Sequence, residues 1–196
     1  MSIAPWRSAI ARALHRNRSL VYARYLQLAT VRDDGRPANR TVVFRGFLED
    51  SNQFKFITDD RSEKATQILL KPWAEVCWYF PSTREQFRIS GCLTLVGSEY
   101  FDPILQQVRI NTWQELSDAA RIQFAWPHPG KPRKREEQKA FILPQPDPVH
   151  PLLNFCLLLL DPAKVDHLEL RGEPQNRWLY RYDDQQNEWL MQEINP

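Results

Sequence analysis

The sequence has 196 residues, of which 42% are apolar, and this predicts a single domain spanning residues 1–196 with a substantial core. Its 26 basic and 24 acidic residues leave a formal charge of +2, too little to attract nucleic acid or an anionic membrane over a distance. No apolar run approaches the roughly 18 residues of a membrane span, and the N-terminal stretch does not resemble a signal peptide. We therefore expect a cytoplasmic protein whose three cysteines stay reduced.

The N-terminal half alternates helical and β-type patterns. Apolar residues at helical spacing predict a helix over Pro5 to Asn17, and Asp34-Gly35 is typical of a hairpin turn. Asp60, with Glu63 three residues later, resembles a capping box for a helix that ends near Leu70. Strands are expected at 21–31, 38–48, 54–58, 74–80 and 85–96, with Gly91 as a bulge or bend in the last.

The C-terminal half begins with two helical patterns and ends in strands. Asp102-Pro103 starts the first helix, whose inward residues are predicted to be Ile104, Leu105 and Val108, and the second covers residues 117–126. Residues 127–151 are rich in proline and predict an extended loop, which could act as a lid. Strands follow at 154–160, 165–170, 178–182 and 189–194. The pattern as a whole predicts a mainly β (α+β) fold built on a small barrel.

Cations and hydroxyls gather at predicted strand and helix ends between residues 38 and 91. Arg40, Thr58, Ser62 and Lys64 could form a phosphate cradle, because a helix N-terminus adds unpaired N–H groups and a favourable dipole. Arg45 would face elsewhere, since an odd spacing from Arg40 puts the two on opposite faces of a regular strand. Ordinary solvated charges at strand ends are the alternative, and spacing alone leaves both readings open.

Other kinds of site have weaker support. Glycine-rich phosphate loops are absent, and the four histidines are neither paired at helical spacing nor next to cysteines, so no metal site is expected. The charged run from Lys131 to Glu137 carries both signs and is typical of a solvated loop, so no nucleic-acid partner is expected.

Five separated blocks resemble the FMN-binding split β-barrel family of pyridoxamine 5′-phosphate oxidases, and the stretch from Trp113 to Pro132 resembles a less characterised branch of it rather than the oxidase proper. The order of the blocks carries the resemblance, since no single block is specific. They are Arg40-Thr41-Val42-Val43-Phe44-Arg45, Phe56-Ile57-Thr58-Asp59, Ser62-Glu63-Lys64-Ala65, Glu85-Gln86-Phe87 and Asn176-Arg177-Trp178-Leu179-Tyr180.

The resemblance implies a homodimer with FMN at the subunit interface and peripheral helices around a split barrel. It implies that Arg40, Thr58, Ser62 and Lys64 hold the phosphate and ribityl end of FMN. Arg45 and Gln86 would lie near the isoalloxazine ring, and the remaining implied cofactor contacts are Val42, Val43, Ile57 and Arg177.

The sequence departs from the oxidase pattern at the cofactor and at the substrate. Glu63 stands where the family has an arginine, which removes one cation from the phosphate site. Glu173 and Gln175 occupy the positions of the family's substrate-binding arginine and histidine, and an acid there would repel a dianionic substrate. Arg45, Arg109 and Gln175 are the substrate contacts that the resemblance leaves, and no catalytic residue is assigned.

These features predict an FMN-dependent oxidoreductase that accepts electrons from a small organic donor other than pyridoxamine phosphate. Two alternatives stay open at this point. One is a flavin-binding or redox-sensing module without turnover, and the other is an authentic pyridoxamine 5′-phosphate oxidase with a rearranged substrate site.

Overall fold

The computed structural model describes residues 3–133 and 139–196. The chain divides into two compact units. The first contains the described residues up to Phe56, together with Lys71–Thr94 and Leu159–Pro196, and the second contains Ile57–Leu70 and the described part of Leu95–Leu158. Each unit is treated separately below.

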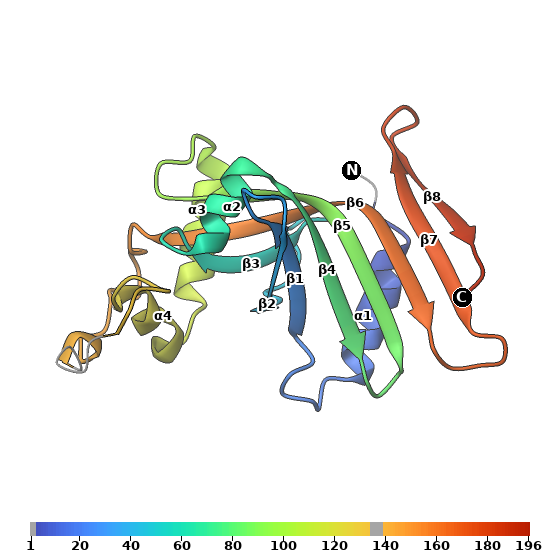
Figure 1. The fold of residues 1–196 in the computed structure, drawn as a ribbon, viewed down its shortest axis with the longest axis horizontal. Helices are drawn as coiled ribbons and strands as arrows, with labels where there is room; N and C mark the ends of the chain where they lie inside the picture. The colour runs from blue at the N-terminus through green and yellow to red at the C-terminus, as the bar shows by residue number, and fades with distance from the viewer. Residues whose placement is uncertain (1–2, 134–138) are drawn as a thin grey trace. The chain divides into compact units, whose positions relative to one another are not determined.

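Eight strands form one sheet over the described residues, which confirms the mainly β prediction. The sheet order is β2-β1-β4-β5-β6-β7-β8, and β3 pairs with β6 (Figure 1). The strands are β1 (Tyr25–Val31), β2 (Pro37–Val43), β3 (Phe54–Asp59), β4 (Trp73–Phe80), β5 (Glu85–Val96), β6 (Phe155–Glu169), β7 (Asn176–Asp183) and β8 (Glu188–Glu193).

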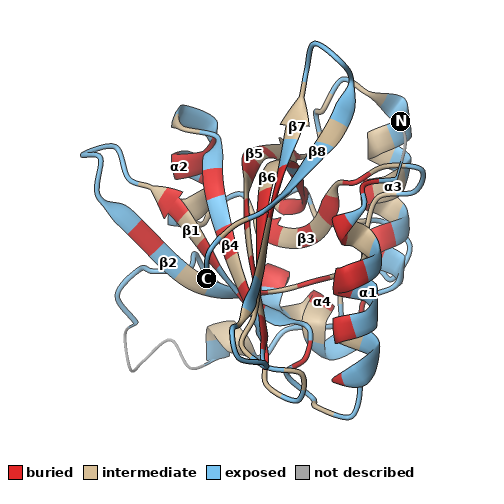
Figure 2. Ribbon diagram, turned by 90° about the vertical axis from the view of Figure 1, so that its right-hand side faces the viewer, coloured by how far each residue is buried: buried red, intermediate tan, exposed pale blue. Residues whose placement is uncertain are grey.

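The first unit begins with the predicted amphipathic helix α1 (Trp6–Arg16). Its buried residues, at helical spacing, are Trp6, Ala9, Ile10 and Ala13 (Figure 2). Trp6 stacks on Phe54 with ring centroids 5.6 Å apart, so the helix is anchored by an aromatic contact as well as by apolar burial. The β1–β2 hairpin turns at Gly35, whose φ of 84° favours glycine, as the Asp34-Gly35 pair predicted.

Three strand predictions need correction. The strand expected to reach residue 48 ends at Val43, after which Arg45 N–H donates to the Lys55 carbonyl. The strands expected at 154–160 and 165–170 are one strand, β6. Pro162 is tolerated within it because pairing with β7 begins only at Lys164, so the missing N–H costs no bond in that ladder.

Gly91 is not a bulge in the pairing of β5 with β4. Ser90, Gly91 and Cys92 oppose three consecutive residues of β4 without interruption. Glycine is needed there because a Cβ would lie 1.9 Å from the carbonyl oxygen of Asp161 on β6. Gly91 therefore does mark a special backbone position, but the reason is that the backbones of β5 and β6 approach closely there.

The second unit carries the remaining helices: α2 (Glu63–Leu70), α3 (Pro103–Gln114) and α4 (Asp118–Ala125). The capping box predicted at Asp60 is wrong, since α2 begins at Glu63 and Ser62 is the residue that precedes it. Asp102 caps α3 as predicted, accepting from the N–H groups of Ile104 and Leu105. None of the helices in the described residues is long and apolar enough to cross a membrane.

The inward face predicted for α3 is also wrong. Ile104 is 74% exposed and Leu105 and Val108 are half-buried, whereas the buried residues of the helix are Arg109, Thr112 and Trp113. Trp113 packs edge-on against Phe155 at 5.0 Å and belongs to the aromatic core of this unit. A large ring at the core outweighs the small aliphatic residues in setting the helix orientation.

The proline-rich stretch 127–151 contains no strand in its described residues and only a short 3-10 turn at 139–141. This agrees with the predicted loop. Much of the charged run expected at 131–137 lies outside the described residues. All three cysteines are free thiols, as expected, and burial raises the pKa of Cys156 to about 12.

Candidate functional site

Three predicted cradle residues of the second unit come together at the start of α2. The hydroxyl groups of Thr58 and Ser62 lie 3.3 Å apart, and Lys64 Nζ donates to Ser62 Oγ at 3.2 Å. Thr58 is the next-to-last residue of β3 and Ser62 immediately precedes the helix, so the turn between strand and helix sets their separation. Two hydroxyls and an ammonium group at a helix N-terminus form a donor set suited to a phosphate.

A half-buried ion pair that was not predicted from the sequence holds this turn in place. Arg61 binds Asp59 with both Nε and Nη2, at 2.9 and 2.6 Å, and its backbone N–H donates to the same carboxylate. The Arg61 guanidinium also donates to the carbonyls of Phe124 and Trp126, and Asn154 donates to Asp59. The carboxylate thus connects three segments of the second unit.

The charge state of Asp59 follows from these contacts. Burial alone would raise its pKa, but the hydrogen bonds from Arg61 and Asn154 and the Arg61 charge outweigh burial and lower the pKa. All three guanidinium nitrogens of Arg61 donate hydrogen bonds to Asp59 or to backbone carbonyls, so this side chain is fixed within the turn. The only signal in the sequence was an acid two residues before an arginine at a helix start.

The predicted residues of β2 belong to the first unit and have a separate geometry. Arg40 is half-buried opposite Leu28 of β1, and its Nη1 donates to the carbonyls of Leu28 and Ala38 and to Thr30 Oγ1 at 2.5 Å. Val42 is buried and Val43 half-buried. The backbone of the two neighbouring strands therefore fixes the guanidinium of Arg40.

Arg177 is held by another carboxylate, Asp166, which is buried. Its Nε and Nη2 donate to the two oxygens of Asp166 at 3.0 and 2.7 Å, and Arg88 Nη2 donates to the same carboxylate at 2.7 Å. Burial would raise the pKa of Asp166, but the hydrogen bonds and charges of the two arginines lower it. Asp166 and Arg88 were not predicted, since their relation to Arg177 depends on strand pairing.

The remaining predicted residues lie in varied surroundings. Gln86 is half-buried on β5 opposite Tyr79, Arg45 follows the end of β2, and Ile57 packs against the aromatic core of the second unit. Arg109 is buried, donates to the carbonyls of Phe155 and Leu152, and has its pKa lowered by burial.

Gln175 lines an open hollow of about 690 Å³ in the first unit, together with Glu173. Arg84 and Arg171 line the same hollow. Glu173 therefore shares this hollow with two arginines, which the sequence alone did not indicate. The two positive charges reduce the repulsion that Glu173 alone would exert on an anionic substrate.

The comparisons with known proteins agree with the fold and with the FMN-binding class. The sequence matches the family described as pyridoxamine 5′-phosphate oxidase, FMN-binding domain, over residues 3–97. Pyridoxine/pyridoxamine 5′-phosphate oxidase 2 of Arabidopsis thaliana is 40% identical over 169 residues, which cover 86% of this chain and 85% of that protein.

Solved structures of related proteins share the fold of this chain. A crystal structure of a pyridoxamine 5′-phosphate oxidase-related, FMN-binding protein from Nostoc punctiforme is 69% identical over 100% of both chains, with a TM-score of 0.96. PhzG from Burkholderia lata, solved with tetrahydrophenazine-1-carboxylic acid, covers 100% of this chain and 98% of its own at 20% identity, with a TM-score of 0.76, and so shares the fold.

The class is therefore an α+β split-barrel protein of the FMN-binding type, as the five sequence blocks predicted. The chain belongs to the pyridoxamine 5′-phosphate oxidase family. The expected cofactor, FMN, is confirmed at the level of this family.

Proposed function

We propose that this protein is an FMN-dependent oxidoreductase acting on a small organic electron donor. The observation that carries the proposal is the group formed by Thr58, Ser62 and Lys64 at the N-terminus of α2, which supplies hydroxyl and ammonium donors for a phosphate. When bound, FMN supplies a two-electron acceptor for a hydride from the donor. The residues of this chain supply placement and charge.

In this proposal the phosphate end of FMN is held by Thr58, Ser62 and Lys64, with Arg40 serving the same end as the resemblance implies. The Asp59–Arg61 pair fixes the turn that carries the two hydroxyls, so these donors are positioned before the cofactor arrives.

At the ring end, Arg45 and Gln86 are proposed to set the polarity around the isoalloxazine. Arg177 is proposed to contact the cofactor while Asp166 fixes its orientation through two hydrogen bonds. Val42, Val43 and Ile57 would supply apolar contacts. As in the family resemblance, we propose a homodimer with FMN at the subunit interface, located in the cytoplasm.

The substrate proposed here is a donor other than pyridoxamine phosphate, because Glu173 and Gln175 replace the family's substrate-binding pair. A second candidate is the authentic oxidase. It is favoured by Arg84 and Arg171, which line the hollow around Glu173, and by the similarity to the Arabidopsis enzyme. Arg45, Arg109 and Gln175 remain the proposed substrate contacts for either candidate.

Anaerobic mixing tests the activity. The FMN-loaded protein is mixed with pyridoxamine phosphate, reduced nicotinamides and a panel of amines, and flavin absorbance is followed. Bleaching by a donor outside the pyridoxamine class supports the main proposal, and bleaching by pyridoxamine phosphate alone supports the authentic oxidase. Failure of every donor to bleach a properly bound flavin would contradict both and favour a binding module.

Titration with FMN tests the residues. Lys64→Ala should weaken FMN binding by about tenfold to a hundredfold, since a hydrogen bond to a charged group contributes roughly 1.5–3 kcal/mol. Lys131→Ala removes an exposed lysine from the proline-rich loop and is the matched control, with unchanged affinity expected. Equal affinities in the two variants would remove Lys64 from the proposed site.

A further inference from the structure

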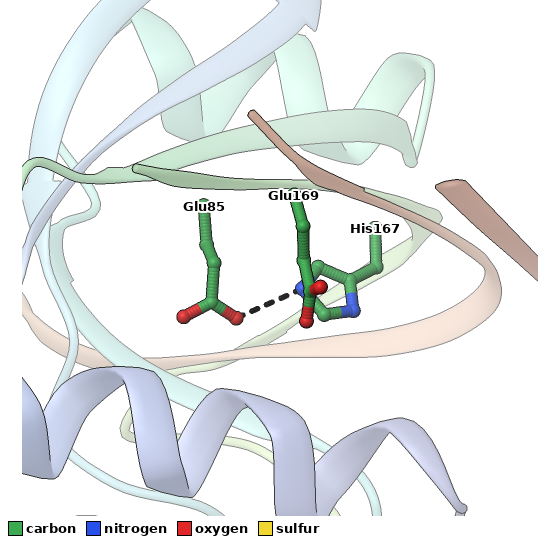
Figure 3. Close-up of side chains that lie close together, drawn as sticks. All are labelled: Glu85, His167 and Glu169. Carbon is green, nitrogen blue, oxygen red and sulfur yellow. Dashed lines mark hydrogen bonds and ion pairs between the residues drawn. The ribbon is translucent and has the colours of Figure 1, made fainter. Parts of the chain in front are cut away.

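Three potential metal ligands converge in the first unit, outside the proposed flavin residues. Glu85 begins β5, and His167 and Glu169 lie two residues apart near the end of the neighbouring strand β6, so their side chains share one face. One ligand atom from each of the three residues lies within 4.8 Å of the other two. Figure 3 shows the three side chains directed toward one another.

The imidazole of His167 is held rigidly in this cluster. Its side chain is 3% exposed, its Nε2 lies 2.9 Å from Glu85 Oε2, and Phe87 stacks on the ring at 4.1 Å. Its Nδ1 is buried without a hydrogen-bond partner in the described part of the chain. A buried imidazole with only one nitrogen satisfied is unusual, because such groups normally find partners for both.

The third ligand has more freedom than the first two. Glu169 is half-buried and accepts one hydrogen bond, from Asn176 Nδ2 at 3.3 Å. Tetrahedral coordination with bonds of about 2.1 Å needs donor atoms about 3.4 Å apart. Glu85 and His167 are already closer than that, so binding requires their hydrogen bond to open and Glu169 to move inward by side-chain rotation.

The cluster also borders a cavity, which leaves room for an exchangeable ligand. The cavity has a volume of about 370 Å³, and both glutamates line it. Its other lining residues are Arg16, Ser82, Thr83 and Arg171. The two guanidinium groups oppose a cation, so we expect the metal to bind weakly and reversibly.

We propose that Glu85, His167 and Glu169 bind a divalent transition metal ion of the Zn²⁺ class. One imidazole and two carboxylates suit Zn²⁺, Mn²⁺, Fe²⁺ or Co²⁺, whereas Ca²⁺ and Mg²⁺ prefer sites made only of oxygen ligands. The arginines at the cavity wall favour an anionic group as the additional ligand. These residues were not predicted as metal ligands, since Glu85 and His167 are 82 residues apart and meet only in the folded sheet.

The test is calorimetric titration of the full-length, FMN-loaded and chelator-treated protein with ZnCl₂ alone. Binding of about one zinc ion per chain is expected. When Co²⁺ replaces Zn²⁺, a visible absorption band should appear that is typical of tetrahedral or five-coordinate cobalt. Glu169→Gln should weaken zinc binding at least about tenfold while leaving the buried Glu85–His167 pair intact. The flavin content of each variant is recorded, so loss of zinc with intact flavin separates this site from the cofactor site.

His150→Ala is the matched control, because His150 and Asp147 form another histidine–carboxylate pair among the described residues, exposed and with Nδ1 and Oδ2 2.7 Å apart. Its zinc affinity should equal that of the wild type. The inference is overturned if the wild type takes up no zinc, if Glu169→Gln binds as tightly as the wild type, or if His150→Ala abolishes binding.

Discussion

Asp166→Asn should destabilise the protein by about 2–4 kcal/mol, because the Asp166 carboxylate forms ion pairs with two guanidinium groups at once. The carboxylate is 6% exposed and accepts three hydrogen bonds, of 3.0, 2.7 and 2.7 Å, from Arg177 and Arg88. Breaking a buried ion pair costs roughly 3–5 kcal/mol. The two arginines are 26% and 40% exposed, so water takes over part of their solvation and the expected cost is lower.

Thermal unfolding of the flavin-free protein measures this effect. In a protein of this size, about 2–4 kcal/mol corresponds to a fall in Tm of roughly 5–15 °C. Asp161→Asn is the matched control, since Asp161 is an exposed residue of the same strand. Its free energy of unfolding should differ from that of the wild type by no more than about 0.5 kcal/mol, so its Tm should hardly change. Equal Tm values for the two variants would refute the reasoning.

The pH dependence gives a second check on Asp166. Its pKa is lowered in the folded protein, so its stabilising contribution is present above the ordinary value of 3.8 and is lost as the pH falls through the folded-state pKa. The stability difference between wild type and Asp166→Asn should therefore be largest near neutral pH and shrink below about pH 4. A difference that stays constant well below pH 4, through the range in which the carboxylate is protonated, would mean that the carboxylate charge is not responsible.

Two further predictions test the fold and the turn before α2. Gly91→Ala should cost at least about 1–3 kcal/mol in denaturant unfolding, because its Cβ would lie 1.9 Å from the backbone oxygen of Asp161, whereas Gly97→Ala, with its nearest contact at 3.6 Å, should be close to neutral. Similar stabilities for the two would contradict the close approach. Asp59→Asn should weaken FMN binding at neutral pH, because it loosens Arg61 and the turn, and an unchanged affinity in the titration would show that this ion pair does not position the donors.

Local patterns in the sequence predicted most of the secondary structure for physical reasons that are themselves local. The helix at the N-terminus has its apolar residues at helical spacing, and Asp34-Gly35 supplies the positive φ that the hairpin requires. The β5 strand was predicted with its observed bounds because its alternating pattern is uninterrupted. Local patterns also predicted correctly that the side chains of Thr58, Ser62 and Lys64 come together where β3 leads into α2.

The errors arose where distant partners decide the outcome. Arg109 is buried on α3 because the carbonyl oxygens of Leu152 and Phe155 accept its hydrogen bonds. These partners lie more than 40 residues away in the sequence, so they could not be predicted from the residues around Arg109. For the same reason the inward face of α3 was misassigned. Asp166 was overlooked because its arginines come from strands that are adjacent only in the folded sheet.

The direct test of the central claim compares FMN with riboflavin, which lacks the phosphate, in titrations of the wild type and Lys64→Ala. If Thr58, Ser62 and Lys64 hold the phosphate, the wild type should prefer FMN strongly. Lys64→Ala should then lose about tenfold to a hundredfold in FMN affinity while binding riboflavin as the wild type does. Equal affinity of the wild type for both flavins, or an equal loss for both in Lys64→Ala, would contradict a phosphate site at the start of α2.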